Sequence, residues 1–303
     1  MTEKQLLPRE PGTIRIAQIS DMHCYRVTLS PLQFLSKRWI GNFNVLFNRR
    51  LKYHKDPNPA MIQLFEDLGV DHVILSGDLT TTSLPAEFQV ARDFADQIEA
   101  RGIQVHAIPG NHDNYTKHSL RTKIFYRYFE QETRDHGFSM RDHGVALRPL
   151  AKGWWWIGLD TTLPTPPFSA IGRFTPEIEA KLEEALRQVP AGDQVLLTNH
   201  FPMFNTIHHS HDMRRCDALR ALLVRWPNVR LYLHGHVHRQ SITDHRSSGL
   251  PIILNSGSCG FKRRATFHLV DLSPDNIKVY VYSREKRGDQ QGNWTLRERA
   301  QFS

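Results

Sequence analysis

The sequence predicts one α/β domain, and three observations lead to this prediction. Short runs of β-branched and apolar residues, of strand length, alternate along the chain with stretches of helical periodicity. No linker rich in Pro, Gly or Ser interrupts the alternation, and no internal repeat is present. A polar motif follows directly after each of five strand-like runs. Because sites in layered α/β folds assemble at the carboxyl ends of strands, we expect these motifs to meet at one edge.

The expected elements can be placed along the chain in order. The five strands preceding the motifs are residues 13–19, 71–75, 104–108, 194–198 and 229–233. The helices are residues 58–68, 85–100, 176–188 and 217–226. Thr175 fits the N-cap of the third helix, with Pro176 in its first turn. Trp154, Trp155 and Trp156 precede a further strand signal, and strand alternation places Trp155 opposite its neighbours, so we expect this triplet to pack in the core.

Length and composition fit this organisation. The chain has 303 residues, 40% of them hydrophobic, which suffices for a sizeable core. We expect a polar N-terminal segment at residues 1–12, the domain at 13–283 with a basic amphipathic insert at 24–56, and a polar C-terminal tail at 284–303.

Each motif supplies side chains that bind metal ions. The motifs are Asp21-Met22-His23, Gly77-Asp78, Gly110-Asn111-His112-Asp113, Asn199-His200 and Gly235-His236-Val237-His238. Carboxylates, an amide and imidazoles without a thiolate suit two divalent ions, for which we expect Mn, with Fe or Zn as alternatives. Two ions about 3.5 to 4 Å apart can share one carboxylate, for which Asp78 is placed, and lower the pKa of water. Any single motif is as easily a turn or a cap, but the five together predict a binuclear metallohydrolase.

The ordered set of motifs resembles the calcineurin-like metallophosphoesterase superfamily over residues 13–271. The resemblance implies a four-layer αββα sandwich. It implies one ion on Asp21, His23, Asp78 and His238, and a second on Asp78, Asn111, His200 and His236. It also implies that His112 contacts the scissile phosphate as general acid, with Asp113 orienting His112 or holding its proton. An alternative role for Asp113 is the N-cap of a helix beginning near Asn114.

The motifs of this sequence differ from those of two branches of the superfamily, which disfavours both branches. Protein serine/threonine phosphatases carry an Asp-Arg pair soon after the Gly-Asp motif, whereas Leu79, Thr80 and Thr81 follow it here. Their Gly-Asn-His motif ends in Glu, whereas the corresponding motif here ends in Asp113. Purple acid phosphatases place a metal-binding tyrosine after Gly-Asp, and residues 79–83 contain none. The broad phosphodiesterase-like group remains.

Charge is concentrated in the insert. The net charge is +8 with a pI near 9.5, and residues 22–55 contain no acidic residue. Basic and large apolar side chains alternate there, which is typical of a segment at a membrane interface. A helix covering the core explains the spacing equally well, and nucleic acid fits less well because many of the apolar residues are aliphatic. The candidate substrate or membrane contacts are Lys37, Arg38, Trp39, Phe43, Phe47, Arg49, Arg50 and, beyond the insert, Arg239.

A narrower resemblance concerns Ser36-Lys37-Arg38 to Gly41, Asn44, Arg49-Arg50 and residues 231–239 and 251–258. These are similar to the chlamydial-type UDP-2,3-diacylglucosamine pyrophosphatases of lipid A biosynthesis. The resemblance implies hydrolysis of UDP-2,3-diacylglucosamine to UMP and lipid X, with the insert holding the acyl chains near the inner leaflet. The alternative is a phosphodiesterase for cyclic nucleotides or other small diesters. A nuclease would need wider basic coverage, and a non-catalytic scaffold would be expected to lack ligands.

The remaining features concern location and the cysteines. The three cysteines are widely separated and form no CxxC pair, so we expect no disulfide framework. The N-terminus lacks the basic and apolar sections of a signal peptide, and no apolar run approaches the roughly 20 residues that span a bilayer. We expect a cytoplasmic protein, peripheral on the inner face of the membrane. His208, His209 and His211 lie in an expected loop that would either border the second ion or be solvated.

Overall fold

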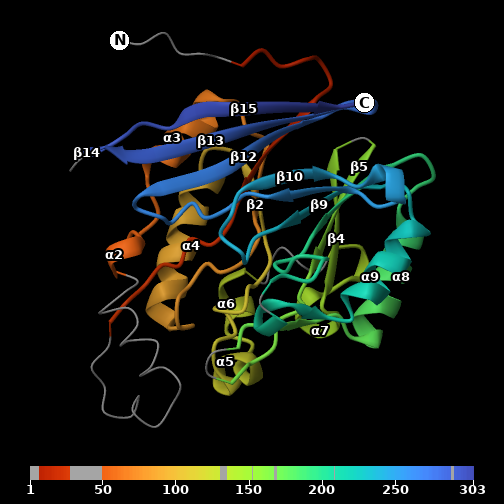
Figure 1. Cartoon of the computed structure of the whole chain (residues 1–303), viewed down its shortest axis with the longest axis horizontal. Helices are drawn as coiled ribbons and strands as arrows, with labels where there is room; N and C mark the ends of the chain where they lie inside the picture. The colour runs from red at the N-terminus through yellow and green to blue at the C-terminus, as the bar shows by residue number, and fades with distance from the viewer. Residues whose placement is uncertain are drawn as a thin grey trace.

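Two β-sheets lie face to face, with helices on their outer faces (Figure 1). The computed structural model describes residues 7–27, 50–129, 135–151, 153–166, 169–207, 209–287 and 290–303. The expected four-layer αββα arrangement is therefore confirmed in the described part of the chain. Residues 28–49, which make up most of the insert, lie outside the described residues. This range includes the candidate contacts Lys37, Arg38, Trp39, Phe43, Phe47 and Arg49.

The first sheet has the strand order β14-β13-β12-β1-β2-β3, and β15 also pairs with β13. Its strands are β1 Ile14–Ile19, β2 His72–Leu75, β3 Gln104–Ala107, β12 Arg264–Leu272, β13 Ile277–Arg287, β14 Gln290–Gln291 and β15 Thr295–Phe302. β1, β2 and β3 are parallel, whereas β12 runs antiparallel to β1. The carboxyl ends of β1, β2 and β3 therefore lie at one edge.

The second sheet has the order β10-β11-β9-β7-β5-β4. Its strands are β4 Val145–Ala151, β5 Trp154–Leu159, β7 Gln194–Thr198, β9 Val229–His234, β10 Ser241–Asp244 and β11 Ile252–Asn255. The four central strands, β5, β7, β9 and β11, are parallel. A separate two-stranded ribbon joins β6 Gly172–Arg173 to β8 Met213–Arg214.

The helices match the expected segments where the periodicity is long. The α-helices are α2 Arg50–Lys52, α3 Ala60–Asp67, α4 Pro85–Glu99, α5 Lys117–Thr122, α6 Phe125–Phe129, α7 Met140–His143, α8 Pro176–Gln188 and α9 Cys216–Val224. The described residues also form the 3-10 turns η4 Asp135–Gly137, η5 His209–His211 and η6 Arg246–Ser248. Thr175 caps α8 as predicted, since its side chain accepts from the N–H of Ile178 at 3.3 Å.

Strand alternation divides the core into two apolar layers. On β5, Trp154 and Trp156 are buried between the sheets, in the same cluster as residues of β1 and β12. Ile157 and Leu159 cluster instead with residues of α8 and α9, and the half-buried Trp155 packs against that second layer. The prediction that Trp155 lies opposite its neighbours is confirmed.

The prediction of a polar tail at 284–303 is wrong. β13 continues to Arg287, and β15 pairs with β13 at the edge of the first sheet. Leu296 and Phe302 pack against the core while most of the residues between them are exposed, and a register shift between Val281 and Tyr282 interrupts the alternation along the strand pair. The charged residues of β15 suit an exposed edge.

Two further observations bear on the sequence expectations. The three cysteines are all free and buried, in agreement with the expected lack of a disulfide framework. Among the described residues, no helix is both long and apolar enough to cross a membrane.

Candidate metal centre

Five loops converge at the carboxyl ends of β1, β2, β3, β7 and β9. Backbone hydrogen bonds join these loops to one another and to neighbouring strands, among them Asp21 N–H to Gly77 C=O at 3.0 Å and Gly235 N–H to His200 C=O at 3.1 Å. The two sheets thus present their motif-bearing loops to a common point, as the strand-end argument predicts.

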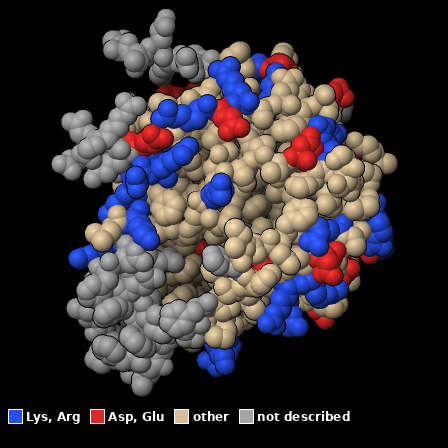
Figure 2. Space-filling model, viewed as in Figure 1, with Lys and Arg blue, Asp and Glu red and all other residues tan. Residues whose placement is uncertain are grey.

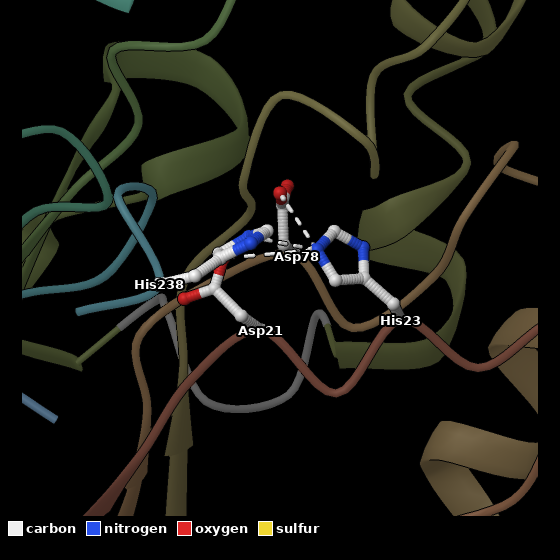
Figure 3. Close-up of side chains that lie close together, drawn as sticks. All are labelled: Asp21, His23, Asp78 and His238. Carbon is white, nitrogen blue, oxygen red and sulfur yellow. Dashed lines mark hydrogen bonds and ion pairs between the residues drawn. The ribbon is translucent and has the colours of Figure 1, made fainter. Parts of the chain in front are cut away.

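One set of side chains points into a single small space (Figure 3). One ligand atom from each of Asp21, His23, Asp78 and His238 lies within 4.8 Å of the others. His238 Nε2 is 2.9 Å from Asp21 Oδ1 and 3.0 Å from His23 Nε2. Ligand atoms held tetrahedrally at zinc-like distances are about 3.4 Å apart, so the spacing fits one cation.

A second set adjoins the first through Asp78. His200 Nε2 lies 3.4 Å from Asp78 Oδ2, and the ring centroids of His200 and His236 are 5.1 Å apart. Asn111 Oδ1 and His200 Nε2 are buried and have no hydrogen-bond partner among the described residues. Buried polar atoms without partners are costly, and a cation that accepts their lone pairs removes the cost. These donors therefore fit a divalent ion, and Asp78 adjoins both sets of donors.

Backbone carbonyls fix the tautomers of three histidines. His200 Nδ1 contacts the Ser76 carbonyl at 2.9 Å, His236 Nε2 the His211 carbonyl at 3.0 Å, and His112 Nδ1 the Thr81 carbonyl at 2.7 Å. A carbonyl can only accept, so each of these nitrogens carries a proton, and in the neutral ring the other nitrogen keeps a lone pair. The contact to His211 also shows that the expected histidine loop borders the second set, although His208 lies outside the described residues.

The backbone at the site is unusual. Five of the candidate ligands have positive φ angles: Asp21 54°, His23 50°, Asp78 54°, His236 72° and His238 53°. Each non-glycine residue in the left-handed region costs about 1–3 kcal/mol and persists only where surrounding structure imposes it. At Gly235 the chain passes so close to the side chains of Ser20 and Asp21 that a Cβ would overlap them. The loops are thus held in conformations that aim side chains at the ion positions.

Asp113 joins two loops of the site, and its expected role toward His112 stays a prediction. Its carboxylate accepts hydrogen bonds from the N–H groups of Leu79, Thr80 and Gly110 and from the Thr80 hydroxyl. It therefore joins the Gly77-Asp78 loop to the Gly110–Asp113 loop, while the Thr81 carbonyl orients His112. The N-cap prediction is wrong, because the next helix, α5, begins at Lys117 with Thr116 as its cap. Burial and the nearby charge of Asp78 raise the pKa of Asp113 to about 7.

Tyr53 was not singled out by the sequence analysis. Its hydroxyl lies 2.9 Å from His238 Nδ1, and its ring contacts the His23 ring edge-on at 4.8 Å. No sequence signal marks it, because it reads as one more aromatic residue at the end of the basic insert.

An open groove adjoins the centre beside His238. Phe261, at 5.5 Å from the His238 ring, lies between the metal centre and this groove. The groove has a volume of about 830 Å³, and its lining residues are Leu51, Lys52, Phe261, Arg263, Arg264 and Glu285. Basic side chains gather over α2 and the neighbouring strands (Figure 2). Arg50 on α2 and Arg239 after His238 are both exposed, and their roles as substrate or membrane contacts stay predictions.

Comparisons with known proteins agree with this geometry. A family model described as Calcineurin-like phosphoesterase matches residues 14–240. A 3',5'-cyclic adenosine monophosphate phosphodiesterase CpdA of Vibrio vulnificus is 23% identical over 267 residues, covering 87% of this chain and 84% of that protein. A probable glycerophosphodiester phosphodiesterase GpdQ of Arcobacter nitrofigilis is 27% identical over 177 residues, covering 57% of this chain and 58% of that protein. A dimetal phosphatase from Danio rerio has a similar fold, with a TM-score of 0.62 at 14% identity, covering 93% of this chain and 98% of that one.

Proposed function

Because the chain belongs to the calcineurin-like phosphoesterase family and is a metallophosphoesterase, we propose that it hydrolyses a phosphodiester or pyrophosphate bond with two divalent metal ions. The observation that carries this proposal is the position of Asp78, whose carboxylate lies between two sets of donors. One set would be Asp21, His23, Asp78 and His238, and the other Asp78, Asn111, His200 and His236. We propose Mn as the ion, because the donors are oxygen and imidazole nitrogen without a thiolate; Fe and Zn are the alternatives.

The residues of the chain have separate tasks in this reaction. The bound ions would supply Lewis acidity toward the phosphoryl oxygens and lower the pKa of the attacking water. His112 is half-buried beside the first set, with its ring 4.9 Å from that of His23. Its Nδ1 proton is donated to the Thr81 carbonyl, so in the imidazolium form a second proton on Nε2 can pass to the leaving oxygen and return the ring to its neutral form. Asp113 keeps the two loops that bear Asp78 and His112 together.

We propose that the substrate is an acylated nucleoside-diphosphate sugar, UDP-2,3-diacylglucosamine, and that hydrolysis of its pyrophosphate gives UMP and lipid X. The groove beside His238 supports this choice. Leu51, 69% exposed, and Phe261 offer apolar surface, while Lys52, Arg263 and Arg264 offer positive charge for phosphate. A substrate of this kind resides in a membrane, so the proposal includes peripheral contact with the anionic inner face of the cytoplasmic membrane.

A second candidate is hydrolysis of small soluble diesters such as cyclic nucleotides. The names of the two relatives, a cyclic AMP phosphodiesterase and a probable glycerophosphodiester phosphodiesterase, favour it. This reaction would use the same metal centre, but the groove beside His238 would have no role in it.

The two candidates separate in one set of assays. Metal-stripped protein restored with Mn is supplied with UDP-2,3-diacylglucosamine in detergent micelles, with cyclic AMP and with an aryl phosphodiester. UMP release with a kcat/KM far above that for the soluble diesters supports the lipid substrate, and efficient cyclic AMP hydrolysis without UMP release contradicts it. Charge reversal by Lys52→Glu with Arg263→Glu should lower only the lipid activity, whereas the control Arg187→Glu on α8 should change neither.

A further inference from the structure

We propose that Tyr53 is a positioning residue that holds the metal ligand His238 in its binding tautomer. This inference rests on the proposed function, because it concerns the same metal centre. It assigns a task to a residue from the end of the insert, which none of the metal motifs contains.

The contacts of Tyr53 point at the first set of ligands. Its hydroxyl lies 2.9 Å from His238 Nδ1, and its ring meets the His23 ring at 4.8 Å with an interplanar angle of 79°. Its other face packs on Phe261 at 4.7 Å, and only 4% of the residue is exposed. A buried tyrosine normally places its hydroxyl on a partner, and here that partner is an imidazole of the site.

The backbone around Tyr53 is held on both sides. The N–H of His54 donates to the Gly260 carbonyl at 2.9 Å, and the N–H of Lys262 donates to the Lys52 carbonyl at 2.7 Å. Tyr53 and Phe261 form an antiparallel bridge between these two bonds. These bonds fix the backbone of Tyr53, so the position of its hydroxyl is set by the backbone as well as by the side-chain rotamer.

The contact between the Tyr53 hydroxyl and His238 Nδ1 matters because a neutral imidazole carries a proton on only one of its two nitrogens. An imidazole that binds an ion through Nε2 carries its proton on Nδ1, and that proton needs an acceptor. Backbone carbonyls do the equivalent for His200 and His236. For His238 the acceptor is the Tyr53 oxygen, which leaves the Nε2 lone pair directed at Asp21 and His23.

The test is Tyr53→Phe, which keeps the ring and removes the oxygen. Stepwise Mn binding and the visible absorption spectrum of the Co(II)-loaded protein are measured together. Loss of an outer-shell partner typically weakens metal binding about 10–100-fold, so we expect one of the two ions to bind that much more weakly, with a changed Co(II) spectrum, while the other is unaffected. Tyr25→Phe, the same change in the neighbouring segment, should leave both ions and the spectrum as in the wild type.

Two results would overturn the proposal. One is wild-type affinity for both ions, with an unchanged spectrum, in Tyr53→Phe. The other is an effect of the same size in a His238→Asn background, since a residue acting through His238 has nothing to act on there. Failure of the proposed function is recognised separately, because the wild-type protein itself would then not bind two ions.

Discussion

The backbone N–H of His112 donates to Asp78 Oδ1 at 2.8 Å, so the proposed shared metal ligand and the proposed proton donor are fixed relative to each other. Burial alone would raise the pKa of Asp78, but in the metal-free protein the positive charges that His200 and His112 carry when protonated outweigh it and hold that pKa well below its usual range. The carboxylate therefore stays ionised, as its proposed role as a metal ligand requires. The His112 ring lies beside the candidate ligand His23, with 4.9 Å between the ring centroids.

His112→Ala should lower kcat by about 10²–10⁴-fold, the range for loss of a general acid, while the number of bound ions stays the same. The reason is that the ring is not among the donors of either set. Steady-state kinetics with metal analysis of the same sample checks this. Unchanged kcat would remove His112 from the proton transfer.

Asp78→Asn should weaken the binding of both ions, whereas Asn111→Ala should weaken the binding of only one. Asp78 faces both sets of donors, and the buried Asn111 oxygen belongs to the second. Stepwise Mn titration of the two variants shows the difference. If Asp78→Asn lost a single ion, Asp78 would not be shared.

Arg15→Met should lower the free energy of unfolding by about 3–5 kcal/mol, because it leaves the buried Asp271 without its partner. Arg15 Nε lies 2.6 Å from Asp271 Oδ1, and the two side chains are 3% and 6% exposed. Arg101→Ala breaks an exposed pair with Glu66 and should cost about 0–1 kcal/mol. Urea unfolding of the metal-free proteins compares them, and equal losses would contradict the assignment of Arg15 to the core.

The stability of the metal-free protein should fall as pH decreases below 6.5, in part because of His268. Burial, with a smaller contribution from His234, lowers the pKa of His268 from 6.5 to about 3. Between these values the unfolded chain binds a proton that the folded chain does not, so acid favours unfolding. His268→Gln can still pair with Gln18 and Gln240, and it should flatten the decline. The control is His118→Gln on the exposed face of α5. Equal pH slopes for wild type and His268→Gln would contradict this contribution.

The parts of the fold that the sequence predicts are those with strong periodicity. The motif-bearing strands and the helices α4 and α8 have long or uninterrupted apolar patterns, and their ends lie within one or two residues of the prediction. β15 was missed because its apolar residues are few and its charged residues dominate the composition. An edge strand buries too little to show a clear pattern.

The sequence predicts the candidate ligands of the site but not the residues that hold them in place. Histidine and aspartate residues at strand ends can be identified as candidate metal ligands, because metal binding depends on the type of side chain. The contacts of Asp113 and Tyr53 depend on which loops lie side by side, and no periodicity encodes that. The left-handed backbone of Asp21 and Asp78 is likewise imposed by the surrounding loops.

The most direct test of a two-metal phosphodiesterase is to titrate metal-free protein with Mn while counting bound ions and following hydrolysis of an aryl phosphodiester. We expect two ions per chain and activity that appears only as the second ion binds. Hydrolysis that persists in excess chelator, or full activity with one ion bound, would contradict it.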